Sequence, residues 1–178
     1  MTITSFAIFT IFEIVCLREF VKRRNKALVS EVIVSYVLTS ALLLWLYFDN
    51  VSVPKYMIIL FLLCLVMNTF LGYYLNLYNE SKTFDRYLHA FGSFSFSILA
   101  YSILSDVFNQ TFDSDLFAGI IVFSLGITLG TIFEIIEFIS DKSRNTKHQH
   151  GLADTDYDMI FNMIGSVIAA VYVVLFIN

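Results

Sequence analysis

The stretch Gly151–Gly165, GLADTDYDMIFNMIG, decides how this chain is interpreted, because it places acidic residues at the head of an apolar segment. Its polar members Asp154, Asp158 and Asn162 recur every four residues. On a helix these positions share one face. The rest of the segment is apolar enough to lie in lipid, where a polar stripe is costly unless it contacts protein groups or a water-filled cavity. We therefore expect polar partners for this stripe elsewhere in the chain.

The composition indicates a membrane protein. Of the 178 residues, 58% are hydrophobic and 15% are charged, and the mean hydropathy is +0.76. Soluble domains average about 45–50% apolar and about 25% charged residues. Cys16 and Cys64 both lie inside apolar runs, which predicts buried thiols rather than a disulfide framework or a zinc site. The sequence contains no basic patch typical of nucleic-acid binding.

Six segments are long enough to cross a hydrocarbon core about 30 Å thick. The predicted spans are residues 3–21, 27–48, 54–77, 84–107, 116–140 and 157–177. The expected fold is an all-α membrane protein, a bundle of about six transmembrane helices that forms a single integral membrane domain over residues 1–178.

The basic residues predict the orientation of this bundle. Ten of the eleven Lys and Arg residues fall at the first, third and fifth connections, and only Lys55 falls at the second or fourth. By the positive-inside rule the first set of connections is cytoplasmic, which places both termini outside. The expected partners are membrane lipids, with no nucleic acid; the sequence specifies no protein partner.

Two other predicted spans carry acidic or histidine pairs at the same end as the stripe of the last span. Asp85 and His89 lie four residues apart at the start of the fourth span, and Glu134 and Glu137 lie near the end of the fifth. An acid at a helix N-terminus is favoured by the helix dipole, which is an ordinary explanation for Asp85. It cannot explain Glu134, which lies near a helix C-terminus among apolar neighbours. The predicted site consists of seven residues: Asp85, His89, Glu134, Glu137, Asp154, Asp158 and Asn162.

Crowding of five carboxylates predicts a compensating positive charge. Such groups repel one another unless protons, the nearby Arg86 or a bound cation neutralise them. Carboxylate oxygens suit Mg²⁺, Mn²⁺ or Ca²⁺, and one imidazole also admits Zn²⁺ or Fe²⁺. The hypothesis is one divalent cation, Mg, Mn or Zn, with these ligands: Asp85, His89, Glu134, Glu137 and Asp158.

Several further polar residues have ordinary explanations. Thr155, followed three residues later by Asp158, fits a capping box that would start the last helix. Glu13 could join a polar core or pair with a neighbouring helix for packing alone. His148 and His150 are expected to be solvent-exposed loop residues, with a ligand role as the alternative.

Small and amide side chains predict helix packing. Gly126 and Gly130 form a pair that lets another helix approach closely. In the third span Asn68, Gly72 and Asn76 share one face, and hydrogen bonds between helices explain them.

Three motifs in this order carry a family resemblance: Asp85-x-x-x-His89, Glu134-x-x-Glu137 and Asp154-Thr155-x-x-Asp158-x-x-x-Asn162-x-x-Gly165. Together they cover about the last hundred residues, and the set resembles the small bacterial membrane proteins grouped as YjdF-like and VanZ-like. VanZ-like members tend to show E-x-x-Q and a basic residue before the last motif, so Glu137 and the His150-Gly151 loop favour the YjdF-like branch. The resemblance implies a multi-pass protein of the bacterial cytoplasmic membrane. For VanZ itself it implies a link to glycopeptide (teicoplanin) resistance.

Three functions remain open at this stage. One is a metal-assisted enzyme that acts on a lipid or isoprenoid phosphate headgroup, with His89 or a carboxylate moving protons. A second is a proton- or cation-coupled transporter, which the lack of an evident duplicated half disfavours. The third is a non-catalytic scaffold or envelope-stress protein whose polar cluster holds helices together.

Overall fold

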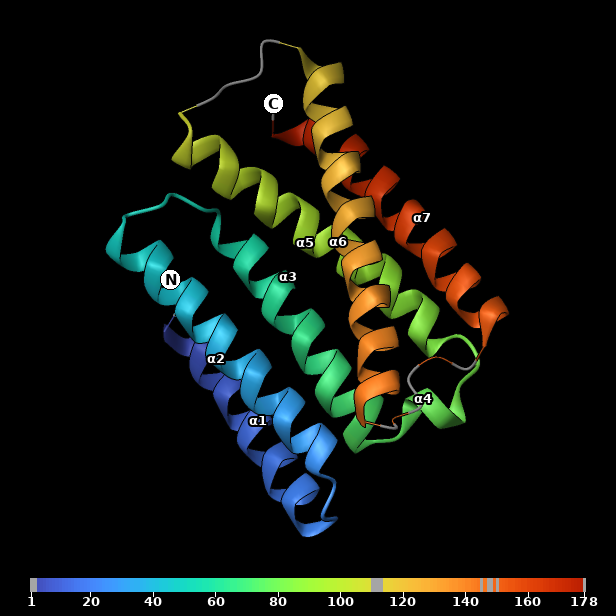
Figure 1. Cartoon of the computed structure of the whole chain (residues 1–178). Coiled ribbons are helices and arrows are strands. Elements are labelled where there is room, and N and C mark those ends of the chain that lie inside the picture. The colour runs from blue at the N-terminus through green and yellow to red at the C-terminus, as the bar shows by residue number, and fades with distance from the viewer. Residues whose placement is uncertain (1–2, 110–113, 145, 147–148, 150, 178) are drawn as a thin grey trace. The chain divides into compact units, whose positions relative to one another are not determined.

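The structure, a computed structural model, describes residues 3–109, 114–144, 146, 149 and 151–177 (Figure 1). Within these residues every regular element is a helix, and no strand occurs. The all-α expectation is therefore confirmed. The chain packs as two compact units, Met1–Phe84 and Asp85–Asn178. The expectation of a single membrane domain stays a prediction.

Five helical segments are long and apolar enough to cross a membrane. They are α2 (Lys26–Phe48), α3 with its continuation η1 (Lys55–Tyr74), α5 (Phe84–Val107), α6 (Asp115–Arg144) and α7 (Leu152–Phe176). Helix α1 (Ile3–Lys22) forms where the first span was predicted, but Glu13, Arg18 and Glu19 interrupt its apolar character. Its membrane crossing and the placement of the termini remain predictions.

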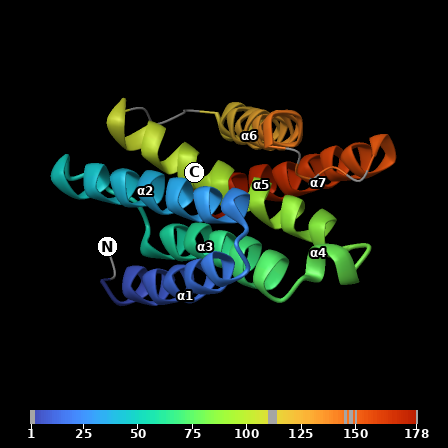
Figure 2. The same cartoon turned by 60° about the horizontal axis from the view of Figure 1, so that its bottom comes forward.

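In the first unit, helices α1, α2 and α3 lie side by side in both views (Figures 1 and 2). A tight turn joins α1 to α2. Arg24 adopts a left-handed conformation with φ 56°, and the Asn25 side chain caps α2 by accepting a hydrogen bond of 3.1 Å from the Leu28 amide. The turn lets Cys16 and Phe20 pack in the core of this unit, where both are fully buried.

The third span ends in an irregular way that the sequence pattern does not predict. Helix α3 (Lys55–Val66) widens into a π-helix, η1 (Met67–Tyr74), a rare geometry that occurs often at functional sites. A short helix, α4 (Leu77–Glu80), then returns the Tyr78 ring onto Gly72, and the Tyr78 hydroxyl donates a hydrogen bond to Asn68. Asn76 lies outside the helix with φ 67°. The predicted continuation to Leu77 is therefore wrong, and Asn68 bonds within its own hairpin.

In the second unit, small residues bring α6 and α7 together in antiparallel orientation. A Cβ atom at Gly130 would lie 2.5 Å from Asn162 Cγ, and one at Gly126 would lie 2.3 Å from Ser166 Oγ. These distances are shorter than any ordinary contact, so only glycine fits at either position. The close contact predicted for this glycine pair is confirmed.

Helix α5 lies parallel to α7 and approaches it through a third glycine. A Cβ atom at Gly165 would lie 2.0 Å from the Ala90 carbonyl oxygen. Above and below this contact, aromatic pairs join Tyr87 to Phe161 and Phe94 to Tyr172. The two backbones therefore touch one turn from Asn162 and fix the position of its side chain.

The start of α7 corrects a prediction. The helix begins at Leu152, and its N-cap residue is Gly151 with φ 118° and no side-chain cap. The amide of Thr155 donates to the Gly151 carbonyl oxygen at 3.3 Å, so Thr155 is already inside the helix. The capping box predicted for Thr155 and Asp158 is wrong, because glycine at a positive φ starts the helix one turn earlier. His148 and His150 lie outside the described residues.

A candidate metal centre of carboxylates and histidine

The predicted site residues gather at one end of the second unit. Helix α5 begins at Phe84, α6 ends at Arg144 and α7 begins at Leu152, and these three ends lie together (Figure 1). Each helix turns one polar face toward the other two. The fold therefore brings the predicted residues of three helices to one place.

His89 lies at the centre of this cluster. Its Nε2 atom is 3.4 Å from Asp85 Oδ1, on the preceding turn of α5, and 3.5 Å from Glu134 Oε1 on α6. Hydrogen bonds between a charged donor and a carboxylate usually measure about 2.7–2.9 Å. The imidazole therefore faces two carboxylates without a close bond to either.

The contact of the other ring nitrogen, Nδ1, orients the His89 imidazole. Its Nδ1 atom lies 3.3 Å from Asn162 Oδ1, and the same oxygen accepts a 2.7 Å hydrogen bond from the Ser93 hydroxyl. An amide oxygen has two lone pairs and can accept both. With this amide orientation Nδ1 can donate to Asn162 Oδ1, and in that neutral tautomer Nε2 is the nitrogen available to a metal. Metal-bound histidines are oriented by the same kind of hydrogen bond.

Two sets of potential metal ligands share this histidine. Asp85, His89 and Asp158 form one set, and His89, Glu134 and Glu137 form the other. In each set the ligand atoms lie within 4.8 Å of one another. Ligands on opposite sides of an octahedral Mg²⁺ are about 4.2 Å apart, so small side-chain movements would close either set around an ion. These five residues are the ones predicted as metal ligands from the sequence.

Three polar side chains of the cluster are buried with unsatisfied atoms. Glu134, Asp158 and Asn162 are 5%, 2% and 3% exposed. Glu134 Oε1, Asp158 Oδ1 and Asn162 Nδ2 have no hydrogen-bond partner within the described part of the chain. A buried polar atom without a partner costs about 1–3 kcal/mol, and a charged one costs more. Helix packing by itself does not account for this arrangement.

The remaining predicted residues lie at the edge of the cluster. Glu137 is half-buried one turn after Glu134, and Asp154 is half-buried one turn before Asp158. Asp156 is exposed and stands apart from the ligand sets. Asp154 belongs with the cluster by position, although neither ligand set includes it.

The connection after α6 contributes two contacts that the sequence reasoning missed. Asp141 is half-buried and accepts hydrogen bonds from the Thr146 hydroxyl at 2.6 Å and the Gln149 amide at 3.0 Å. The Gln149 side chain lies 3.4 Å from both Oε2 and the backbone oxygen of Glu134. Asp141 therefore anchors the loop that brings Gln149 to the site. A glutamine in a polar loop carries no pattern that would have identified it.

Arg86 adopts a position that the sequence did not indicate. Its guanidinium carbon lies 3.9 Å from the centre of the Tyr157 ring, and its Nε atom is buried with no hydrogen-bond partner among the described residues. A guanidinium over an aromatic face gains a cation–π attraction. The contact links the first turn of α5 to the second turn of α7.

Glu13 belongs to the first unit, and it is 3% exposed. Its carboxylate lies beside the Thr69 side chain of η1, on a neighbouring helix of the same unit. A packing role for Glu13 therefore stays open alongside a role in a polar core.

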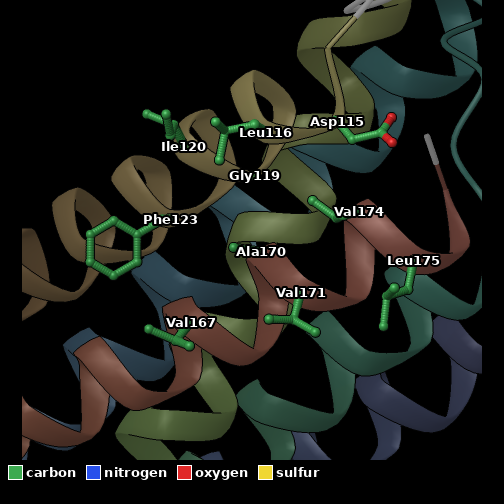
Figure 3. Close-up of a pocket in the computed structure, with 10 residues that line it drawn as sticks. All are labelled: Asp115, Leu116, Gly119, Ile120, Phe123, Val167, Ala170, Val171, Val174 and Leu175. Carbon is green, nitrogen blue, oxygen red and sulfur yellow. The ribbon is translucent and has the colours of Figure 1, made fainter.

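A groove on the second unit lies away from the cluster. It follows the opposite ends of α6 and α7, between the start of α6 and the end of α7, and has a volume of about 530 Å³ (Figure 3). Apolar side chains such as Phe123, Val171 and Val174 line it, and Asp115 lies at its end. Asp115 is the one ionisable group among the residues that line this groove, whereas the cluster gathers several carboxylates and a histidine, so the candidate site is the cluster.

The helices define a multi-pass helical membrane protein, and its second unit contains a cluster of carboxylates around a histidine. Residues 3–178 match the model of a family described as "Predicted membrane protein (DUF2238)", and the chain belongs to this family. A Thermotoga maritima protein titled "Uncharacterized protein" is 35% identical over 102 residues, which make up 56% of this chain and 52% of that relative. The match thus spans about half the length of the relative. No solved structure matches this chain.

Proposed function

We propose that this protein is an enzyme that binds one divalent cation in the cluster and acts on a phosphate-bearing lipid headgroup at the membrane boundary. The observation that carries the proposal is the geometry around His89. His89 Nε2 lies 3.4 Å from Asp85 Oδ1 and 3.5 Å from Glu134 Oε1, one carboxylate from each ligand set, and these distances suit ligands separated by an ion. Without a cation or additional protons the same groups repel one another.

The chemistry of the ligand set supports a phosphate substrate. Carboxylate oxygens with one imidazole suit Mg²⁺, Mn²⁺ or Zn²⁺. Such a cation polarises a phosphoryl oxygen and offsets the charge that develops there. We assign proton transfer to Asp154, which is half-buried at the edge of the cluster and belongs to neither ligand set.

The site lies in membrane-spanning helices, which favours a substrate that is itself held in the membrane. The orientation predicted by the basic residues puts the cluster at the cytoplasmic leaflet. The resemblance of the three motifs to YjdF-like and VanZ-like proteins supports a bacterial cytoplasmic membrane as the location. Lipid or isoprenoid phosphates of that leaflet are the proposed substrates.

The test is a melting series on the full chain purified in detergent. A chelator should lower the thermal midpoint of the wild type, and added Mg²⁺ or Mn²⁺ should restore it by mass action. Glu134→Gln and Asp158→Asn keep the size of the side chain but remove a negative ligand, so both should weaken this response. Asp156→Asn is the matched control, because Asp156 is exposed on the same helix and should leave the response intact.

Elemental analysis of the same preparations identifies the ion, and lipid analysis of a deletion strain identifies the substrate. Accumulation of one phosphate-bearing lipid in that strain, relieved by the wild-type gene and not by the Asp158→Asn gene, would support the enzyme. A wild type that binds no metal and shows no chelator response would refute it and leave a cluster held by shared protons, as in a transporter or scaffold.

A further inference from the structure

Arg86 is a basic side chain near the cluster that has no role in the proposed metal centre. A guanidinium has five N–H donors and no lone pair, so it cannot ligate a metal. Its Nε atom is nevertheless buried without an acceptor, which is costly unless a ligand supplies one. The preferred acceptors of a guanidinium are carboxylate and phosphate oxygens, which it can bind in a two-pronged geometry.

The position of this side chain ties it to the metal site. Arg86 follows Asp85 directly in α5, and Tyr157 precedes Asp158 directly in α7. The stacked pair therefore occupies the same two helical turns as one of the two ligand sets. Tyr157 is 46% exposed, so its ring is open to the surroundings on one side while it supports the guanidinium on the other.

From these contacts we propose that Arg86, held in place by the Tyr157 ring, binds the phosphate group of the substrate beside the metal ion. This inference rests on the proposed function and deepens it, since it assigns the residue that recognises the anion. The Tyr157 ring holds the planar Arg86 guanidinium group in place before the substrate binds. This lowers the conformational entropy that the arginine side chain loses on binding.

The cluster makes this binding depend on the metal. The five carboxylates of the cluster, at the same helix ends as Arg86, repel a phosphate, and a divalent cation among them reduces that repulsion. Metal and phosphate therefore bind with positive coupling, and by linkage each raises the affinity of the other by the same factor. Coupling between sites is typically about 5- to 150-fold. A phosphate site that acted alone would show no such dependence.

The experiment measures the affinity of the full chain in detergent for dioctanoyl phosphatidic acid, with Mn²⁺ or with chelator. Inorganic phosphate and dioctanoyl phosphatidylcholine form two further arms. For the wild type we expect the phosphatidic acid to bind at least about 5-fold more tightly with Mn²⁺. Inorganic phosphate should compete if the phosphate group itself is recognised, and its failure to compete would show that the site requires the lipid. Equal binding of phosphatidylcholine would overturn the assignment.

The variants separate the arginine from the metal. Arg86→Gln should weaken phosphatidic acid binding by about 10- to 100-fold, the loss expected for hydrogen bonds to a charged group, while Mn²⁺ binding without lipid is not weakened. Arg86→Lys keeps the positive charge but lacks the paired N–H donors of the guanidinium group, so it should recover only part of the affinity for phosphatidic acid. Lys142→Gln is the control, because Lys142 also lies over a ring, that of Phe138 at 5.8 Å, at the same end of the unit.

Failure of this inference differs from failure of the proposed function. If the wild type binds Mn²⁺ and Arg86→Gln binds phosphatidic acid as tightly as the wild type does, the metal centre stands and the role of Arg86 is refuted. If the wild type binds no Mn²⁺, the proposed function falls first. Thermal midpoints of all variants exclude misfolding as the cause, and Tyr157→Leu, which removes the ring alone, should reproduce part of the Arg86→Gln defect.

Discussion

Replacement of Gly165 by alanine tests whether the approach of α5 to α7 builds the site. A Cβ atom at this position would lie 2.0 Å from the Ala90 carbonyl oxygen and 2.8 Å from its carbon. These are backbone atoms, so no side-chain rotation relieves the clash. Heavy atoms in contact prefer about 3.5 Å, and α5 and α7 must therefore separate locally by about 1.5 Å.

The energetic effect follows from three terms. Overpacking of this kind costs about 1–3 kcal/mol. The Ser93 to Asn162 hydrogen bond, now 2.7 Å, would lengthen beyond bonding distance, a loss of about 1 kcal/mol. Alanine offsets about 1 kcal/mol of this through its higher helix propensity. The net loss is about 1–3 kcal/mol, which lowers the midpoint by about 2–12 °C for a chain of this size.

The assay is thermal unfolding of the full chain in detergent, followed by size-exclusion chromatography, together with the chelator response of each variant. Gly119→Ala is the matched control, because its Cβ atom would lie 3.0 Å from the Val174 Cγ2 methyl, a side chain that can move, and at an ordinary 4.0 Å from the Ala170 carbonyl oxygen. We expect the control to melt at or above the wild-type midpoint. A Gly165→Ala protein as stable as the control, with an unchanged chelator response, would refute the idea that this contact positions Asn162.

Two further predictions concern the α6–α7 contact and the orientation. Gly130→Leu should lower the midpoint sharply, since even a Cβ atom would clash with Asn162, whereas Leu129→Ala on the half-buried neighbour should be milder; equal midpoints would contradict the packing role. In a variant without native cysteines, a cysteine at Ser114 should react with an impermeant maleimide on intact cells, and one at Ser143 should react only after lysis. The reverse labelling pattern would overturn the orientation.

Periodicity predicted much of the site because its residues repeat along helices. Asp158 and Asn162 share a face of α7, and Glu134 and Glu137 share a face of α6, as spacings of three and four require. The distribution of basic residues along the chain then predicted that these helix ends lie on the same side of the membrane. Residue spacing depends on one helix alone, and the distribution of basic residues is visible along the whole chain. A single sequence is therefore enough for both predictions.

Features that depend on local backbone geometry escaped prediction. The early start of α7 depends on Gly151 at φ 118°, and glycine occurs for many reasons, so the Thr155 capping box looked equally suitable. The π-helix before Tyr74 has no sequence pattern of its own. The Gln149 contact with Glu134 and the Arg86 contact with Tyr157 depend on where a loop and a second helix lie. Such contacts between elements are not encoded in spacing.

The choice between a packing role and a chemical role depends on where the unsatisfied atoms lie. A polar cluster that only joins helices is most stable when its hydrogen bonds are all made. The reason is that an unpaired buried group destabilises the fold by more than one hydrogen bond stabilises it. Ser93 and Ser166 follow this rule, since their hydroxyls donate to the side-chain and backbone oxygens of Asn162. Glu134 and Asp158, on facing helices, each keep an unpartnered oxygen among the residues described, and each belongs to a ligand set around His89. The serine hydroxyls beside Asn162 are thus satisfied, whereas the two carboxylates of the ligand sets each keep an oxygen without a hydrogen bond, as expected if a ligand completes the site.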